Sequence, residues 1–309
     1  MSTVSNDDIE HALASAGISG YTGTHIALGG GEINDTFKLE LEDRSIILRV
    51  SKYPDQDTLK NEARSLRLLN IDRVPKLLFY DSTQTIHDRK WILEAFIEGQ
   101  SVKQLTVAQY ENFGSLLAEV HQSQTKQKTI DVWSVLISNT KSFGDEAYHL
   151  AHPDPRLSSL VQKMQEYCAD WQAAFAAIPS VIIHGDATPS NVLVDGDNVS
   201  LIDWEMSDFH DPLMEFSTIY YDDMEFNQGK WRKHITAEEK AALFAGYKSA
   251  GGTIDEDRIR FWMNHDKLGA ALFLYWRINQ SGRPATPKQM EQYQLDLNNL
   301  AASLERNLP

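Results

Sequence analysis

Cysteine is almost absent from this sequence, since Cys168 is the single one among 309 residues. One cysteine excludes an intramolecular disulfide framework and any cysteine-rich zinc site. Glycine and proline are sparse, with 17 and 10 residues, which excludes collagen-like and low-complexity chains. Apolar residues make up 42% of the chain, so it can bury a sizeable core.

Positive charge is also scarce. The chain has 29 lysines and arginines against 44 acidic residues, a formal net charge of −15. Binders of nucleic acids or anionic membranes present basic surfaces, so we expect neither partner. The N-terminus lacks the basic and apolar regions of a signal peptide, and the longest apolar run, Leu268 to Trp276, is too short to span a bilayer. We therefore expect a cytoplasmic protein.

The first third of the chain is predicted to be rich in strands. The pattern favours a helix at about 57–70 and strands at 26–28, 36–41, 45–50, 77–80 and 91–96. Together they predict a five-stranded sheet with one inserted helix, forming an N-terminal lobe of residues 1–97. A turn at 98–101 predicts the boundary to a second lobe, residues 98–309.

Helices dominate beyond that turn. They are predicted at 107–120, 155–177, 237–250, 255–280 and 286–307, with a polar loop at 121–128. A β element interrupts them, with strands at 181–183, 192–194 and 199–202. The last two are joined by Asp195-Gly196-Asp197-Asn198, a strong hairpin signal.

The predicted hairpin brings polar residues together. If Val194 pairs with Val199, the antiparallel register places Asn191 beside Asp203. Asp186 enters the same end of the hairpin from the preceding loop. Two carboxylates and one carboxamide converge there, the oxygen donors that Mg²⁺ takes together with phosphates.

Asp186 and Asn191 also have the D-x-x-x-x-N spacing of a kinase catalytic loop. In such a loop the aspartate accepts the proton of a substrate hydroxyl, while Asn191 and Asp203 would hold metal. The alternative is that these are ordinary turn residues. The full string from His184 to Asn191, followed by the hairpin and Ile202-Asp203-Trp204-Glu205, favours the catalytic interpretation, because so many spacings must coincide.

The strings HGDATPSN and LIDWE resemble the catalytic signature of the aminoglycoside phosphotransferase and choline kinase superfamily. The resemblance runs from about Leu28 to Ser217. It implies a bilobal, protein-kinase-like α+β fold, with a five-stranded antiparallel sheet and one helix in the N-terminal lobe and a larger, mostly helical C-terminal lobe that carries the catalytic hairpin. It also implies Asp186 as catalytic base, Asn191 and Asp203 as metal ligands, and ATP or GTP with Mg²⁺ as cofactors.

A glycine turn between two predicted strands resembles the nucleotide loop of this family. Gly29, Gly30, Gly31 and Asn34 belong to it, and glycines let backbone N–H groups approach phosphates closely. A plain glycine hairpin is the alternative.

Arg49 stands where kinases carry the strand lysine that holds phosphates, and Glu62 stands where they carry its helix partner. A guanidinium can bind phosphate and carboxylate bidentately. Lys52 is a competing candidate for the phosphate role, and two surface charges are the alternative interpretation.

The segment from Trp91 to Gly99 resembles the strand and hinge that link the two lobes. Backbone groups from Glu94 to Phe96 are expected to bind adenine. An edge strand without a ligand is the alternative. The chain has no DFG, APE or HRD motif, and Gly185 replaces the arginine that pairs with a phosphorylated activation loop, which disfavours a peptide substrate.

The segment from Asp203 to Glu225 contains eight acidic residues and no lysine or arginine. An acidic cleft would attract a cationic acceptor, and the candidate contacts are Glu205, Asp208, Glu215, Asp222 and Asp223. A solvated acidic face is the alternative. The role of Glu205 stays open between metal support, substrate contact and salt bridge, and Asp211 resembles a structural helix cap.

Aromatic residues in the same half could add the surface that a quaternary ammonium group binds. They are Tyr220, Tyr221, Trp262, Tyr275 and Trp276. Burial in the core is the alternative.

The sequence thus predicts an ATP- and Mg²⁺-dependent kinase that phosphorylates a hydroxyl of a small cationic acceptor, an aminoglycoside or an amino alcohol such as choline or ethanolamine. The alternatives are a catalytically silent nucleotide-binding protein, a kinase of a macrolide or sugar, and a protein kinase.

Overall fold

The computed structural model describes residues 4–30, 34–53, 58–126, 130–132, 154–219, 235–279 and 285–309. The chain forms two compact units. The first comprises Met1–Gln124, Ile182–Asp208 and Ala241–Gly252, and the second comprises Thr125–Val181, Phe209–Lys240 and Thr253–Pro309. The first unit therefore takes in the hairpin and helices beyond residue 97, while the predicted lobe boundary at 97/98 stays a prediction.

A five-stranded antiparallel sheet in the order β1-β2-β3-β5-β4 confirms the prediction for the first third of the chain. The strands are Tyr21–Gly30 (β1), Asn34–Leu41 (β2), Ser45–Ser51 (β3), Leu77–Ile86 (β4) and Arg89–Ala95 (β5). His87 and Asp88 close the β4–β5 hairpin with φ of 50° and 57°, as a tight hairpin turn requires.

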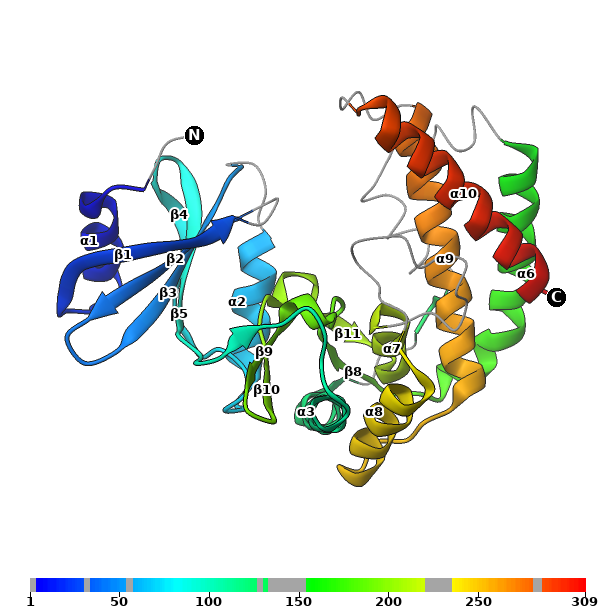
Figure 1. Cartoon of the computed structure of the whole chain (residues 1–309), viewed down its shortest axis with the longest axis horizontal. Helices are drawn as coiled ribbons and strands as arrows, with labels where there is room; N and C mark the ends of the chain where they lie inside the picture. Colours follow the sequence, from blue (N-terminus) through cyan, green and yellow to red (C-terminus); the bar gives the residue numbers. More distant parts are fainter. Residues whose placement is uncertain are drawn as a thin grey trace. The chain divides into compact units, whose positions relative to one another are not determined.

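One helix covers each face of this sheet (Figure 1). Helix α1 (Asn6–Ser15) buries Ile9 and Leu13 in a core cluster with strand residues such as Leu48. Helix α2 (Thr58–Leu68) packs on the other face, as the sequence predicts. The side of the sheet under α1 is therefore mainly apolar, although it also carries the Arg89–Asp35 ion pair, and the other side carries Arg49.

Helix α1 is not among the elements predicted from the sequence. Its start is marked by a capping box, in which the Asp8 backbone N–H donates to Ser5 Oγ and the Ser5 backbone N–H donates to the Asp8 carboxylate. This S-x-x-D pattern before an apolar spacing was the available signal.

The hairpin has the predicted register. Strands β9 (Val192–Asp195) and β10 (Asn198–Leu201) pair Val194 with Val199, and the short strand β6 (Gln100–Ser101) joins β9 on its other side.

Helix α3 (Val107–Ser123) is longer than predicted, and strand β7 (Thr125–Lys126) follows it, so the loop predicted at 121–128 is wrong over 121–126, while residues 127 and 128 lie outside the described ranges. Tertiary contact explains the extension. His121 is buried, and its Nδ1 lies 2.9 Å from the Tyr247 hydroxyl on helix α8 (Ala237–Ser249).

Two glycines let α3 and α8 approach each other at backbone distance. A Cβ atom on Gly114 would lie 2.0 Å from the Leu243 carbonyl oxygen. A Cβ atom on Gly246 would lie 1.8 Å from the Glu111 carbonyl oxygen. The two helices can hold this spacing only while both positions lack a side chain.

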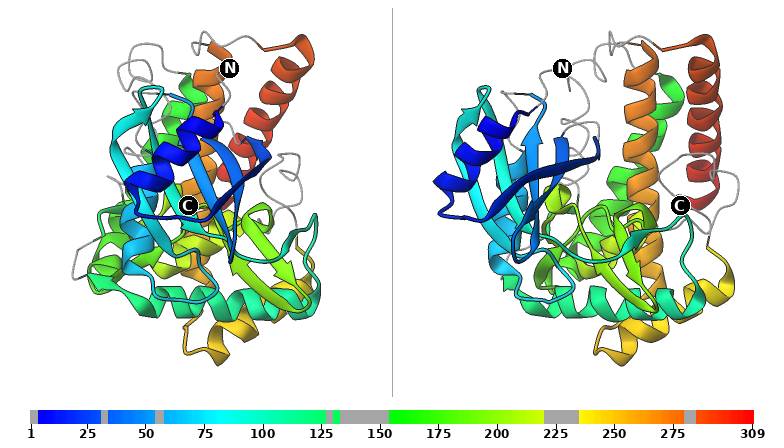
Figure 2. Two further views of the ribbon diagram at one scale, coloured as in Figure 1. Left: turned by 90° about the vertical axis from the view of Figure 1, so that its left-hand side faces the viewer. Right: turned by 60° about the vertical axis from the view of Figure 1, so that its left-hand side comes forward.

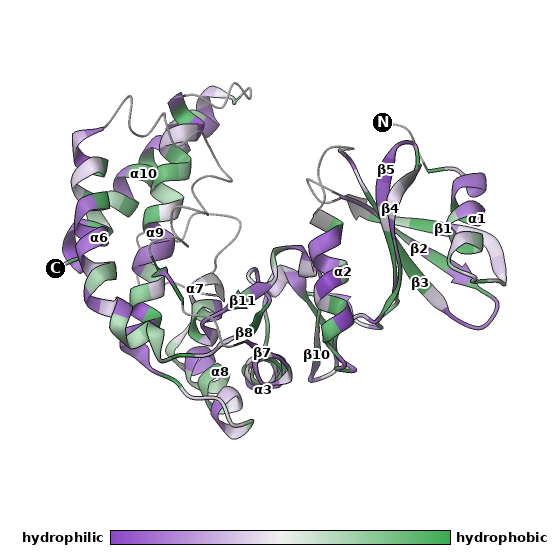
Figure 3. Ribbon diagram, turned by 180° about the vertical axis from the view of Figure 1, so that it is seen from behind, coloured by the Kyte–Doolittle hydropathy of each residue, from purple (hydrophilic) through white to green (hydrophobic). Residues whose placement is uncertain are grey.

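The second unit is built on long helices that pack against one another: α6 (Pro155–Ala176), α9 (Glu256–Asn279) and α10 (Pro287–Asn307). Figure 2 shows α9 and α10 running alongside each other. Figure 3 shows hydrophobic and hydrophilic residues mixed along each of the three. The helices predicted at these positions are confirmed.

The remaining elements are short. These short elements are β8 (Ser180–Ile183), β11 (Asp208–His210), α7 (Glu215–Ile219) and the 3₁₀ turns Pro189–Asn191, Trp204–Met206 and Pro212–Met214. Strands β11, β8 and β7 form a third sheet in that order. Within the described ranges, no helix is both long and apolar enough to cross a bilayer.

The glycine contact generates a prediction. Replacing Gly114 by Ala should destabilise the protein by about 1–3 kcal/mol, because the added methyl group forces the two helix backbones apart. Chemical denaturation of the variant measures this change. Ser115→Ala on the same helix is the matched control and should leave the free energy of unfolding within about 0.5 kcal/mol. A more stable Gly114→Ala variant, as helix propensity alone predicts, would contradict the close approach.

Candidate active site

The open end of the hairpin brings Asp186 and Asn191 together. The Asn191 side-chain amide donates to the Asp186 carboxylate at 3.0 Å and to the Asp186 carbonyl at 2.8 Å. The Ile202 backbone N–H donates to the Asn191 carbonyl at 3.0 Å, which extends the hairpin pairing by one residue. Asn191 therefore stands next to the segment that carries Asp203, as the register predicts.

His184 ties the loop of Asp186 to the hairpin. Its ring is fully buried, its Nδ1 accepts the Asp186 backbone N–H at 3.2 Å, and its Nε2 lies 2.9 Å from the Ile202 carbonyl. Both contacts are satisfied by the neutral tautomer with the proton on Nε2. Histidine is thus used here to position Asp186 rather than to react.

Gly185 fits between His184 and Asp186 for two reasons. Its φ is 81°, in the left-handed region, and a Cβ atom would lie 2.3 Å from the Met206 carbonyl oxygen. The H-G-D sequence is therefore required by the backbone path as well as by the side chains.

Arg49 is the centre of the charged part of the site. Its Nη1 lies 2.5 Å from Glu62 Oε1, and its Nη2 lies 2.8 Å from Asp203 Oδ1. Arg49 is 7% exposed and Glu62 is 0% exposed, so the interpretation of these two as surface charges is wrong. The competing candidate, Lys52, is only partly buried and lies 3.7 Å from Asp35.

Glu62 also binds the turn that follows the hairpin. The Trp204 backbone N–H donates to Glu62 Oε1 at 3.0 Å. Arg49 and Glu62 thereby join strand β3, helix α2 and the turn Trp204–Met206 in one contact network.

Helix α2 holds that turn through Asn61 and Ser65, which sequence reasoning missed. The Asn61 side-chain amide donates to the carbonyls of Glu205 and Ser207 at 2.8 and 2.6 Å. Ser207 Oγ donates to Ser65 Oγ at 2.6 Å. The available signal was their position on α2, one residue before and three residues after Glu62.

Asp203 has an uncommon backbone conformation, with φ 69° and ψ 69°. Aspartate tolerates this left-handed region better than most residues do. Its side chain is 36% exposed, with Oδ1 engaged by Arg49. Asp203 therefore joins the buried charge network and also reaches solvent.

Glu205 and Asn34 complete the network. Asn34, predicted to contact nucleotide, is 3% exposed and donates its amide to Glu205 Oε2 at 2.8 Å. Glu205 Oε2 lies 3.9 Å from Arg49 Nη2. The salt-bridge role left open for Glu205 is thus the one seen in the structure.

The pKa values in this network reflect burial first and charge second. Burial, reinforced by the neighbouring Asp203, raises the pKa of Glu205 to about 7. Burial also raises the pKa of Glu62, against the opposing effect of Arg49. Burial disfavours the charge on Arg49, but Glu62 and Asp203 outweigh it and raise its pKa above the usual value.

The predicted nucleotide residues lie in and beside the sheet. Gly29 and Gly30 end strand β1, and Gly31 lies outside the described residues. Glu94 is buried near the end of β5, and Phe96 follows the strand with Lys38 Nζ 4.3 Å from the centre of its ring.

One backbone donor in the predicted adenine-binding segment is already used. The Ala95 N–H donates to the Lys76 carbonyl at 2.9 Å. Adenine contacts at Glu94 to Phe96 stay a prediction.

An apolar surface on the Arg49 face of the sheet was missed by sequence reasoning. Ile26 pairs with Lys38, and Lys38 pairs with Ile47, so these three share a face. Ile47 lies two residues before Arg49 on β3 and therefore points the same way. Ile26 is 51% exposed, which leaves an apolar side chain facing solvent beside the charged network.

The acidic segment after the hairpin divides into different environments. Asp208 is exposed and lies 3.3 Å from Arg64, and Glu215 is fully buried at the start of α7. Asp222 and Asp223 lie outside the described residues. Burial leaves Glu215 no surface for an acceptor, so this candidate contact is not supported.

Two further predictions are decided in the second unit. Asp211 accepts the Leu213 backbone N–H at 2.9 Å, which confirms its role as a cap. Trp262 is fully buried and donates its Nε1–H to Asp211 at 2.8 Å, so for this residue burial in the core is confirmed, rather than a surface for a quaternary ammonium group. Tyr275 and Trp276 are half-buried, while the tyrosines at 220 and 221 lie outside the described residues.

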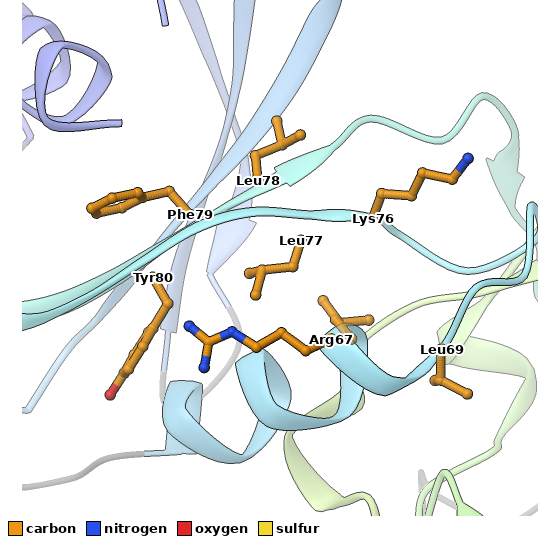
Figure 4. A pocket seen from close by; sticks show the side chains of 8 residues that line it. Arg67, Leu69, Lys76, Leu77, Leu78, Phe79 and Tyr80 are labelled. Atoms are coloured by element: carbon orange, nitrogen blue, oxygen red, sulfur yellow. The ribbon is translucent and has the colours of Figure 1, made fainter. Parts of the chain in front are cut away.

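A shallow pocket of about 470 Å³ lies between α2 and β4 (Figure 4). None of the predicted catalytic, metal or nucleotide residues lines it. Its lining consists of Leu66, Arg67, Leu69, Lys76, Leu77, Leu78, Phe79 and Tyr80.

The hairpin end offers oxygen atoms to a hard cation. The Asn191 amide nitrogen is engaged by Asp186, so its oxygen is available, and the second carboxylate oxygen of Asp203 lies on a side chain that reaches solvent. In the described ranges, this site included, no group of three or more His, Cys, Asp or Glu side chains has a metal-binding arrangement. The donor set therefore suits a cation that takes its other ligands from phosphates and water.

Solved structures share this fold. A choline/ethanolamine kinase family protein from Mesorhizobium loti is 16% identical, with a TM-score of 0.63 over 97% of this chain and 99% of its own. Choline kinase LicA from Streptococcus pneumoniae is 15% identical, with a TM-score of 0.63 over 96% and 98%. A spectinomycin phosphotransferase in complex with ADP and spectinomycin is 15% identical, with a TM-score of 0.58 over 97% and 98%.

The fold is thus that of kinase-like phosphotransferases. Residues 24–262 match the model of the phosphotransferase enzyme family, and the chain belongs to that family. No curated protein sequence matches the chain. The enzyme class, a small-molecule phosphotransferase, is the one predicted from the HGDATPSN and LIDWE strings.

The buried ion pair generates a prediction. Replacing Arg49 by Met should destabilise the protein by about 3–5 kcal/mol, because Glu62 is left as an unpaired buried charge. The double variant Arg49→Met with Glu62→Leu should recover most of that loss. Equilibrium unfolding in urea measures both changes.

Lys52→Met is the matched control, since it removes a partly exposed cation that directly follows the same strand, and it should cost about 1 kcal/mol or less. An Arg49→Met variant as stable as the Lys52→Met variant would show that the network does not hold the unit together.

Proposed function

We propose that this protein is an ATP- and Mg²⁺-dependent small-molecule kinase that transfers the γ-phosphoryl group to a hydroxyl of its acceptor. One observation carries the proposal. Arg49 is held between Glu62 and Asp203, while Asn191 holds Asp186 at the adjacent hairpin end. A kinase needs these groups in these relations, because phosphoryl transfer depends on positioned charge.

Asp186 is proposed to orient the acceptor hydroxyl and to accept its proton. Two hydrogen bonds fix this residue. Its backbone N–H donates to the His184 ring, and the Asn191 side-chain amide donates to its carboxylate. Fixing it in advance lowers the barrier, since no reorganisation is needed when the proton moves.

Asp203 and Asn191 are proposed to hold Mg²⁺, which would neutralise charge on the transferring phosphates. Arg49 is proposed to bind the phosphates from the sheet side, together with the glycine turn that includes Gly29 and Gly30. Both phosphate and carboxylate suit a guanidinium that can form two parallel hydrogen bonds.

ATP is the proposed phosphoryl donor, with GTP as the alternative. The ADP present in the spectinomycin phosphotransferase structure supports a nucleotide for this fold. The exposed side chain of Ile26 on β1 and that of Ile47 on β3, with Lys38 of β2 between them, lie on the Arg49 face of the sheet and could contact a purine ring.

The acceptor is proposed to be a small cationic alcohol, an aminoglycoside or an amino alcohol. The net charge of −15 and the acidic segment after the hairpin support a cationic acceptor. Asp208 is already paired with Arg64, and Glu215 is buried. Glu205 is engaged by Asn34 and Arg49, so among the predicted acidic contacts the proposal depends mainly on Asp222 and Asp223.

The role of Asp186 can be tested with Asp186→Asn. The variant should keep nucleotide affinity but lose about 10²–10⁴ in kcat, the usual contribution of a positioned general base. Turnover of Mg·ATP should be measured with a panel of aminoglycosides, macrolides, amino alcohols and sugars. Asp195→Asn, at the hairpin turn, is the matched control and should behave as wild type. An Asp186→Asn variant within about threefold of wild type would refute the role.

The acceptor charge can be tested with choline and its uncharged carbon analogue, 3,3-dimethylbutanol, or with the equivalent pair for whichever acceptor the panel finds. The KM of the cationic acceptor should rise with salt more than the KM of ATP, because ionic attraction is screened over about 8 Å. Asp222→Asn or Asp223→Asn should raise that KM by about tenfold, the effect of losing one charged hydrogen bond. Asp208→Asn is the control, since Arg64 already neutralises that carboxylate. Equal KM values for the two acceptors would overturn the cationic proposal.

A further inference from the structure

Glu94 faces the same buried network as Arg49, although its backbone lies in the predicted adenine-binding segment. Arg49 pairs with Ile92 across the β3–β5 ladder, and Glu94 lies two residues further along β5. Alternate residues of a strand point to the same face, so Arg49 and Glu94 share a side of the sheet. Glu94 is 4% exposed and Glu62, on the helix above, is 0% exposed.

The two glutamates each have an unsatisfied oxygen. Glu62 Oε1 accepts hydrogen bonds from the Arg49 guanidinium and the Trp204 backbone N–H, while Glu62 Oε2 is buried and has no donor. Glu94 Oε1 is likewise buried with no donor. Buried acceptors without donors are strongly destabilising, so this pair of orphan oxygens needs an explanation.

One proton satisfies both oxygens. Helix α2 packs on β5, so the buried carboxyl groups of Glu62 and Glu94 lie on the same side of the sheet. Two carboxylates cannot hydrogen-bond, because neither carries a donor, whereas a protonated carboxyl group donates to a carboxylate.

The charges around the pair favour that proton. Within the described ranges, Arg49 from β3 is the cation bonded to this network and the His184 ring lies near Glu62, while Glu62 from α2 and Asp203 and Glu205 from the turn after β10 are acidic. Four carboxyl groups, Glu94 included, therefore surround one guanidinium. Burial, and then the charge of Glu62, raises the pKa of Glu94 well above its ordinary value.

We propose that Glu94 is a positioning residue that stays uncharged and donates a hydrogen bond from its carboxyl group to Glu62. This bond fixes the orientation of the Glu62 carboxylate, whose other oxygen holds Arg49 and the Trp204 backbone. Glu94 thereby acts on Arg49 and Asp203 through Glu62, without touching the acceptor.

The consequence for pH has a definite sign. The hydrogen bond is complete below the raised pKa of Glu94 and is lost as the pH rises through it, because Glu94 then becomes a second carboxylate beside Glu62. The guanidinium of Arg49 should therefore be held less firmly as the pH rises through the same range. The effect on phosphoryl transfer rests on the proposed function, whereas the shared proton does not.

The test compares Glu94→Gln, which keeps a donor and cannot ionise, with Glu94→Leu, which has a similar size and no donor. Glu94→Gln should retain kcat/KM within about threefold and remove the alkaline decline that Glu94 causes. Glu94→Leu should lose about tenfold or more in kcat/KM, as expected for a misplaced phosphate ligand. Glu98→Gln, at an exposed carboxylate just beyond β5, is the matched control and should leave activity and pH profile unchanged.

A second readout does not need catalysis. Infrared difference spectra between wild type and Glu94→Gln at neutral pH should contain the carbonyl band of a protonated carboxyl group, and the spectra of Glu98→Gln should not. In unfolding experiments, a double-mutant cycle with Glu94→Leu and Glu62→Gln should show coupling between the two residues.

The outcomes separate the two proposals. If no acceptor is phosphorylated but the infrared band and the coupling are present, the shared proton stands and the proposed function fails. If the band is absent, or if Glu94→Gln is as impaired as Glu94→Leu, the proposal for Glu94 is overturned.

Discussion

The guanidinium of Arg49 is the contact on which the site depends. It binds Glu62 on helix α2 and Asp203 after the hairpin, while its own backbone is central in the sheet. Three elements that are distant in sequence are therefore held by one side chain. Because Glu62 is fully buried, its charge is tolerable only while Arg49 stays in place.

Helix α2 connects the sheet to the catalytic turn through two kinds of contact. Leu59 and Ala63 are fully buried and supply non-directional apolar packing, whereas Glu62 and Asn61 supply directed bonds to the backbone of the turn. Apolar burial can hold a helix near a sheet, but hydrogen bonds determine its rotation and register. The combination explains how a single helix can set the position of Asp203.

The same site collects more negative charge than it neutralises. Glu62, Glu94, Asp203 and Glu205 surround Arg49, on a chain that is acidic throughout. Four acidic side chains around one arginine are stabilised when a further cation binds or when one of the carboxyl groups stays protonated. The proposed Mg²⁺ and the proposed proton on Glu94 are two responses to the same electrostatic constraint.

Much of the fold follows from local pattern. Short apolar segments bounded by turn residues predicted all five strands, and the turn sequence Asp195-Gly196-Asp197-Asn198 predicted the hairpin and its register. The spacing of Asp186 and Asn191 predicted that they would meet at its open end, and they do. These predictions succeeded because strand period, turn type and hairpin register are determined by neighbouring residues.

Other features depend on partners that are far away in sequence. The extension of α3 depends on contacts such as the one from His121 to Tyr247, and the burial of Trp262 depends on helix packing and on Asp211. Asp208 looked like part of an unbroken acidic surface until the fold placed Arg64 beside it.

The sequence alone therefore determined the strand pattern, the β9–β10 hairpin and the family. Only the tertiary structure decided which acids are paired, which aromatics are buried and that Glu94 faces Glu62. Local periodicity specifies which way a side chain points from its own element, but not what another element brings to meet it.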